Sequence, residues 1–135
     1  MELFTFRGGK MINFRYVFHL LECGHFCINY ILKKEGIVNK EDYEKKMMSM
    51  YDIKEVLKRY FNNVNCYKIH SLKGVKTPFI TLVLTKTKSF HYVVVERINS
   101  GIVYYYDPLF WKLKKTNINK FIKRWSNFCC FYSSK

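Results

Sequence analysis

The stretch FHYVVVERINSGIVYYYD, residues 90–107, decides the fold of this chain. Its two halves are runs of β-branched and aromatic residues, and Asn99-Ser100-Gly101 between them is typical of a tight turn. The pattern therefore predicts an antiparallel hairpin with strands over residues 90–97 and 102–106. Such a hairpin would bring His91 and Asp107 to the same end of a sheet.

The sequence around this hairpin divides into a helical first half and a strand-rich second half. Apolar residues at three- and four-residue spacing predict helices that begin near Cys23, Asn39 and Ile53, and a short one over residues 118–125. Further strands are predicted over residues 65–69, 78–85 and 128–132. Helices followed by an antiparallel sheet indicate the α+β class. Since no linker or repeat interrupts the chain, we expect a single domain over residues 1–135.

The composition excludes intrinsic disorder, because 49% of the 135 residues are hydrophobic and 19% are aromatic. No run of about 18 apolar residues is present, and the first residues lack the apolar core of a signal peptide. We therefore expect a domain that stays inside the cell. The net charge of +14 favours an anionic partner: nucleic acid, an anionic membrane face or an acidic peptide. Because no known nucleic-acid-binding motif occurs, we expect no nucleic-acid partner.

The five cysteines are an odd number in a chain without a secretory signal, which predicts free thiols in a reducing compartment. No pair has the Cys-x2-Cys spacing of a structural zinc site. His19, Cys23 and Cys27 follow one another at four-residue steps, but a fourth ligand is missing. We expect neither a metal nor a cofactor.

Three residues are candidates for chemistry. Cys23, expected in the first turn of a helix, would face unpaired N–H groups that favour the reactive thiolate. His91 is placed to act as a base, and Asp107, the only carboxylate side chain in residues 97–135, to orient it. The alternatives are a buried cysteine that only packs, and an Asp-Pro turn beside a histidine at the rim of the sheet.

These residues lie in motifs that resemble a known family. Glu22-Cys23-Gly24-His25-Phe26-Cys27 is similar to the Asp/Glu-Cys-Gly-x-x-Cys motif of the bacteriocin-processing, double-glycine leader peptidases. His91-Tyr92-Val93-Val94-Val95, followed by Asp107-Pro108, resembles the second motif of that family. The family consists of papain-like cysteine peptidases, usually the N-terminal domain of peptide-exporting ABC transporters. The resemblance covers residues 16–132.

The resemblance implies a papain-like fold in which Cys23 is the nucleophile, His91 the general base and acid, and Asp107 the orienting carboxylate. The implied activity is cleavage of a precursor peptide after a double-glycine leader before export. The implied partners are that precursor and an ABC transporter, in the cytoplasm or at the cytoplasmic face of the membrane. Cys27 matches a second family cysteine, for which we expect a packing role.

One family feature is absent from the sequence. Val17 stands six residues before Cys23, where the family has the Gln that helps stabilise the oxyanion, and the chain contains no Gln. His19 and Asn13 are candidates to replace it, and Phe26 stands where the family usually has Ala. Two other classes of function stay open: a leader-binding domain without turnover, and a basic module that binds nucleic acid or anionic lipid.

Overall fold

The predicted hairpin is present in the computed structural model, which describes residues 3–5, 11–41, 47–85 and 88–133, with side chains from residue 22 onward. Strands β5 (Phe90–Asn99) and β6 (Ile102–Asp107) pair antiparallel, with Val94 opposite Tyr106. Ser100 and Gly101 between them have φ values of 51° and 75°. Two successive left-handed residues are what the tightest hairpin turns require.

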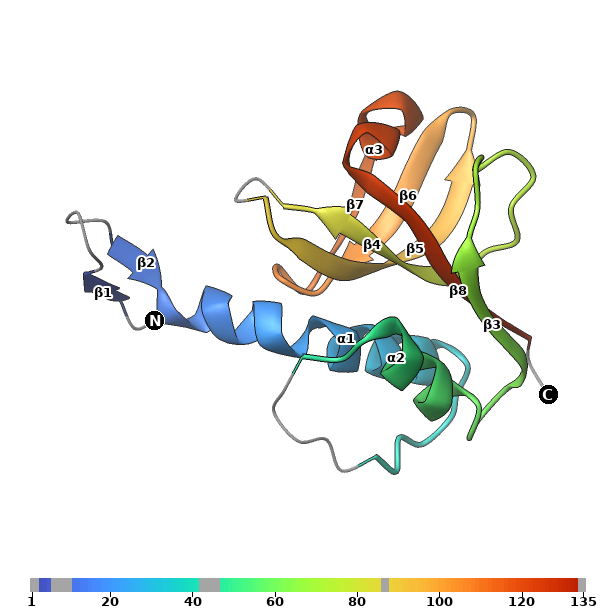
Figure 1. Ribbon diagram of the computed structural model, residues 1–135, viewed down its shortest axis with the longest axis horizontal. Helices are drawn as coiled ribbons and strands as arrows, with labels where there is room; N and C mark the ends of the chain where they lie inside the picture. Colours follow the sequence, from blue (N-terminus) through green and yellow to red (C-terminus); the bar gives the residue numbers. More distant parts are fainter. Residues whose placement is uncertain (1–2, 6–10, 42–46, 86–87, 134–135) are drawn as a thin grey trace.

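The hairpin lies inside a six-stranded sheet in which every neighbouring pair is antiparallel (Figure 1). The strand order is β3-β8-β4-β5-β6-β7. The other strands are β3 (Asn62–Lys68), β4 (Phe79–Leu84), β7 (Lys112–Asn117) and β8 (Trp125–Ser133). The last strand of the chain therefore lies between two earlier ones, and β7 is at an edge.

Helices cover both faces of the sheet. α1 (Phe14–Lys34) and α2 (Met50–Leu57) lie together on one side, and the short α3 (Ile118–Arg124) lies on the other (Figure 1). On β5, Tyr92 and Val94 belong to the core on the α1 side, and Val93 and Val95 belong to the core on the α3 side. Burial on both faces explains the continuous apolar run of this strand. The predicted α+β class is confirmed.

The first helix corrects a prediction. α1 begins at Phe14 and not near Cys23, so Cys23 lies inside the helix and not in its first turn. Residues 14–22 contain no Gly or Pro, so nothing in their sequence interrupts a helix. A small hairpin of β1 (Leu3–Thr5) and β2 (Met11–Asn13), which we did not predict, precedes α1.

The helix predicted to start near Asn39 is also wrong where the structure describes it, because residues 39–41 and 47–49 are not helical; residues 42–46 lie outside the described ranges. The next helix, α2, begins at Met50 and buries Ile53, Val56 and Leu57, so the helix predicted around Ile53 is present. Its start is fixed by a capping box, in which Ser49 Oγ accepts from the Asp52 N–H and Asp52 accepts from the Ser49 N–H. No described helix combines the length and the hydropathy needed to cross a bilayer.

The expectation of free thiols is wrong for Cys66 and Cys130, which form a disulfide. They are directly opposite each other on β3 and β8, with Cα atoms 4.0 Å apart, although 64 residues separate them in sequence. Cysteine spacing alone could not reveal this, since it depends on which strands become neighbours. Cys23, Cys27 and Cys129 are free thiols and are buried.

Candidate active site

The structure brings His91 and Asp107 into contact, as the hairpin predicted. His91 Nε2 lies 3.3 Å from Asp107 Oδ1, and their side chains are only 4% and 6% exposed. His91 is near the start of β5 and Asp107 is the last residue of β6. The antiparallel pairing of these strands is therefore the local cause of the contact.

Asp107 is held as a carboxylate by three neighbours. Burial alone would raise its pKa, but His91, the backbone N–H of Leu109 and Lys114 together outweigh burial and lower it. The Leu109 N–H donates to Oδ1 at 3.0 Å, and Lys114 Nζ lies 3.4 Å from Oδ2. An ionised carboxylate in this position favours the imidazole tautomer with its proton on Nε2, and it would stabilise an imidazolium.

The other ring nitrogen of His91 is available for proton transfer. Nδ1 is buried, and neither ring nitrogen makes an aligned hydrogen bond within the described part of the chain, so the Nε2–Oδ1 contact is close but not well oriented. With Nε2 turned towards Asp107, Nδ1 is the nitrogen that can accept a proton. The geometry places it as the basic atom of the pair.

Cys23 reaches the same strand from α1. Its Sγ accepts a hydrogen bond from the backbone N–H of Tyr92 at 3.4 Å, at the residue that directly follows His91. Cys23 is only 5% exposed. The structure thus places the thiol beside the start of β5, while no described hydrogen bond joins it to the imidazole.

The electrostatics of the thiol differ from the expectation. Burial raises the pKa of Cys23, and the hydrogen bonds from the N–H groups of Tyr92, Gly24 and Cys23 itself offset this only in part. The prediction that a helix start would favour the thiolate is wrong, because Cys23 lies well inside α1 and not in its first turn. The thiol is therefore protonated at rest and needs a base to become a nucleophile.

Gly24 is explained by close packing inside the protein. A Cβ atom at Gly24 would lie 3.1 Å from Met48 Cβ, which is tighter than ordinary contact. The segment that carries Met48 therefore passes directly over α1 beside Cys23. The Tyr92 hydroxyl donates to the Met48 carbonyl at 2.9 Å, so Tyr92 ties both the thiol and this segment to β5. Sequence reasoning missed this positioning role of Tyr92.

Exposed aromatic side chains are close in sequence to His91 and Asp107. Phe90, which precedes His91, is 53% exposed, and Phe110 and Trp111, which follow Asp107 closely, are 56% and 49% exposed. Phe26 on α1 meets Trp111 edge to face, with ring centroids 6.2 Å apart. Phe26 therefore has a partner across the site, which accounts for a large residue at this position. Apolar surface of this kind can hold a peptide segment.

The remaining predicted residues fall into two groups. Cys27 is fully buried, and burial raises its pKa well above the usual value, so its expected packing role is confirmed. The side chains of Asn13, Val17 and His19 lie outside the described side chains, and the replacement of the oxyanion Gln stays a prediction. Within the described residues, no three His, Cys, Asp or Glu side chains are grouped so that they could hold a metal ion.

The chain is similar to peptidases in sequence pattern and in fold. The sequence profile of the Peptidase C39 family matches residues 12–135. A search of curated proteins finds no match. Among solved structures, the peptidase domain of Streptococcus ComA, described as a bi-functional ABC transporter involved in a quorum-sensing pathway, is 17% identical, with a TM-score of 0.65 over 98% of each chain.

Two structures of the Streptococcus mutans ComA peptidase domain are also similar. One is 19% identical, with a TM-score of 0.59 over 84% of this chain and 92% of the other. The second, a complex with a small-molecule inhibitor, is 17% identical, with a TM-score of 0.58 over 98% and 99%. At these identities the likeness shows the fold, which is the papain-like fold of those peptidase domains.

Proposed function

The chain belongs to the Peptidase C39 family, and from this premise we propose that Cys23, His91 and Asp107 form the catalytic triad of a cysteine peptidase. The observation that carries the proposal is the buried contact of 3.3 Å between His91 Nε2 and Asp107 Oδ1 beside the Cys23 thiol. A base held by a carboxylate next to a buried thiol supplies the nucleophile, base and orienting group that peptide hydrolysis needs.

The mechanism follows from the protonation states. His91 Nδ1 takes the proton from Cys23 Sγ, and the thiolate attacks the carbonyl carbon of the scissile bond. The imidazolium, stabilised by Asp107, then gives its proton to the leaving amine as the acyl-enzyme forms. Water activated by His91 releases the acyl group and restores the thiol.

The proposed substrate is a precursor peptide whose leader ends in two glycines, cleaved after the second glycine before export. The family and the motif around Cys23 support this choice. The exposed Phe90, Phe110 and Trp111 would contact the apolar residues of the leader. The proposed partner is an ABC transporter at the cytoplasmic face of the membrane, since the similar solved domains come from such a transporter. The family match over residues 12–135 supports a single peptidase domain.

A cleavage assay with matched cysteine variants tests the proposal. A synthetic precursor with a Gly-Gly site is incubated with the unmodified chain, with Cys23→Ala and with Cys129→Ala, and the products are identified by mass spectrometry. Cys129 is the control because it is also a buried free thiol, but it lies on β8. We expect cleavage after the second glycine by the unmodified chain and by Cys129→Ala, and none by Cys23→Ala. Cleavage by Cys23→Ala at an equal rate would contradict the proposed triad.

A second function, leader binding without turnover, has one specific observation in its favour. The thiol of Cys23 has a raised pKa, and no described hydrogen bond couples it to His91. A binding domain would retain the aromatic surface and need no reactive thiol. If the unmodified chain binds the precursor as tightly as Cys23→Ala does, and neither cleaves it, this second function replaces the first.

A further inference from the structure

A basic cavity lies between the edge strand β7 and helix α3. Its volume is about 550 Å³, and five of its lining residues are cations: Lys112, Lys114, Lys115, Lys120 and Arg124. No carboxylate lines it. A concave site of this size that is lined by five cations and no carboxylate is suited to an anionic ligand.

The positive charge of this basic cavity is largely unpaired within the part of the chain that the structure describes. Within the described residues, only Lys114 of the five has a carboxylate partner, which is Asp107. Residues 97–135 contain no other carboxylate side chain. Four of the five lining cations therefore have no described counter-charge, which favours an anion from outside.

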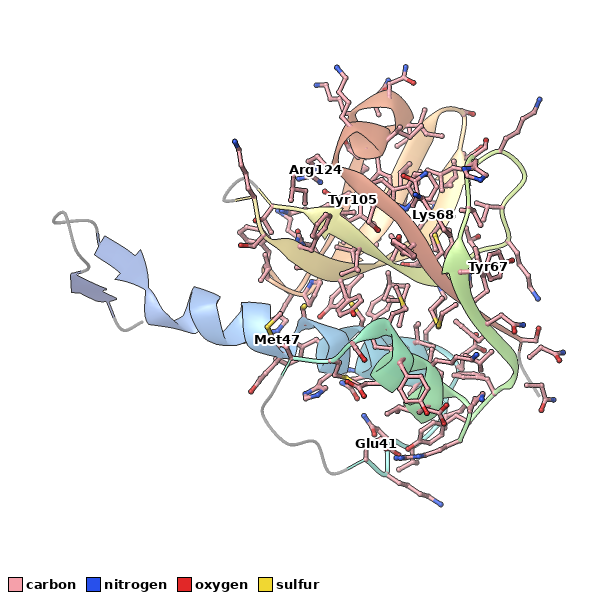
Figure 2. All side chains as sticks on the ribbon, in the orientation of Figure 1. Glu41, Met47, Tyr67, Lys68, Tyr105 and Arg124 are labelled. Atoms are coloured by element: carbon pink, nitrogen blue, oxygen red, sulfur yellow. A yellow bond between two sulfur atoms is a disulfide. The ribbon has the colours of Figure 1, made fainter. Side chains whose placement is uncertain are left out.

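Arg124 is positioned for recognition. It donates from a guanidinium nitrogen to the Tyr105 hydroxyl at 3.4 Å, and Tyr105 is only 5% exposed (Figure 2). Because the buried tyrosine holds one edge of the guanidinium against the sheet, less side-chain freedom is lost when a ligand binds. The remaining N–H groups of the planar fork match the two oxygens of a carboxylate.

The basic cavity adjoins the candidate active site through Lys114. The ammonium of Lys114 lies 3.4 Å from Asp107 Oδ2, and the same side chain lines the cavity. Only the side chain of Lys114 therefore separates a ligand in the cavity from Asp107, which contacts His91.

We propose that the basic cavity binds an acidic segment of the peptide substrate, an inference that rests on the proposed peptidase function. Glu or Asp side chains of the peptide pair with Lys120 and Arg124 and with the neighbouring lysines of β7. The contact of Lys114 with Asp107, a residue of the proposed triad, favours the peptide substrate as the occupant over a lipid surface or a nucleic acid.

A binding measurement tests the basic cavity separately from cleavage. The full chain carrying Cys23→Ala is titrated into two rhodamine-labelled peptides, (Glu-Gly)3 and (Gln-Gly)3, and fluorescence anisotropy is recorded. The same titration is made with Lys120→Met/Arg124→Met added, and with Lys73→Met/Lys76→Met added. The second pair is the matched control, because it removes the same charge from exposed residues at a different cavity. Thermal unfolding of each variant reports on its fold.

We expect the acidic peptide to bind more tightly than the neutral one, and its affinity to fall about tenfold in Lys120→Met/Arg124→Met and less than twofold in the control pair. Equal losses in both pairs, or equal affinity for both peptides, would overturn the proposal. So would tighter binding, through Lys120 and Arg124, of phosphatidylglycerol vesicles or of a DNA duplex.

Failure of this proposal is distinguishable from failure of the proposed function. If the chain binds the acidic peptide through the basic cavity but cleaves no precursor, the proposed role of the cavity is supported and the proposed peptidase function is contradicted. If the chain cleaves an acidic precursor and its Gln-substituted counterpart with the same KM, the proposed role of the cavity is contradicted and the proposed peptidase function is supported. In the expected case, Lys120→Met/Arg124→Met raises KM for the acidic precursor about tenfold and leaves kcat unchanged.

Discussion

At the scale of single residues, the proposed chemistry depends on a thiol that is protonated at rest. Burial raises the pKa of Cys23, as it does for the other free thiols, Cys27 and Cys129. Cys23 differs from them in being slightly exposed, at 5% against 0% for each of the other two. Its reactivity must therefore come from access and from His91 and not from its helix position.

Cysteine labelling tests this distinction. Under non-reducing conditions, iodoacetamide should modify Cys23 faster than Cys27 or Cys129, and the rate should rise with pH because a raised pKa keeps the thiolate scarce at neutral pH. Peptide mass mapping locates the label. Cys66 and Cys130 should be modified only after a reductant is added. Faster labelling of Cys27 or Cys129 would contradict the proposed role of Cys23.

Asp107 supports a prediction about pH and stability. Its pKa is lowered in the folded protein, so its contribution to stability is present above the ordinary Asp pKa of about 3.9 and is lost as the pH falls through the folded value. We expect Asp107→Asn to reduce the free energy of unfolding by about 1 to 3 kcal/mol at pH 7. The difference should shrink towards zero in strong acid.

Urea denaturation at pH 7 and in acid measures the difference in free energy of unfolding between the unmodified chain and Asp107→Asn. The matched control is Glu55→Gln, since Glu55 pairs with Lys58 at 3.6 Å but is 41% exposed. An exposed pair contributes at most about 1 kcal/mol, so this variant should change little. An Asp107→Asn difference that is no larger than that of the control at pH 7 would show that the buried pair does not stabilise the fold.

The closeness of His91 and Asp107 was predictable from sequence, because both belong to one hairpin whose turn, Asn99-Ser100-Gly101, has a typical turn sequence. Tyr92 and Lys114 were not, since their roles depend on contacts with α1, with the segment at Met48 and across β6 and β7. Nothing in the local pattern distinguishes Lys114 from the other lysines of its strand. Tertiary pairing alone gives it a carboxylate partner.

At the scale of elements, the early start of α1 changes the prediction about the oxyanion donor. In a continuous helix from Phe14, residue 19 precedes Cys23 by one turn on the same face, while residue 17 precedes it by six residues and lies on another face. From this spacing along the helix we expect position 19, and not position 17, to supply the oxyanion donor.

Mutation separates the two positions. We expect His19→Ala to lower kcat about 100- to 1000-fold, the usual cost of one oxyanion donor, and Val17→Gln to leave kcat unchanged. Turnover of a double-glycine precursor is the measurement, with circular dichroism as the check on folding. If Val17→Gln raises kcat and His19→Ala leaves it unchanged, the oxyanion donor belongs at position 17 and this prediction is wrong.

The elements that the sequence analysis missed or misplaced differ from the regular core elements in how little apolar periodicity they show. β7, with the sequence KLKKTN, has no apolar alternation because it is an edge strand with mostly exposed side chains. Residues 39–41 and 47–49 are not helical, and the capping box of Ser49 and Asp52 marks Met50 as the start of the next helix. The β5–β6 hairpin, β4, β8 and α3 were predicted because their apolar residues recur at the regular spacing of a strand or a helix and pack in a core.

At the scale of the whole molecule, the charge of +14 predicts how salt acts on recognition. Attraction between an exposed cationic surface and an acidic peptide falls off over a Debye length of about 8 Å at physiological salt. We expect the association rate of an acidic precursor to fall severalfold between 50 and 500 mM salt, and that of its Gln-substituted counterpart to change little. Stopped-flow fluorescence measures both. Identical salt dependence would show that net charge takes no part in recognition.

Covalent trapping is the measurement that tests the central claim most directly. The chain is incubated with a leader-derived peptide that ends in a Gly-Gly chloromethyl ketone, and the modified residue is located by mass spectrometry. The proposed triad predicts a single adduct on Cys23 that forms rapidly in the unmodified chain and at least about 100-fold more slowly in His91→Ala. No adduct, or an adduct on Cys27 or Cys129, would contradict the assignment of Cys23 as the nucleophile.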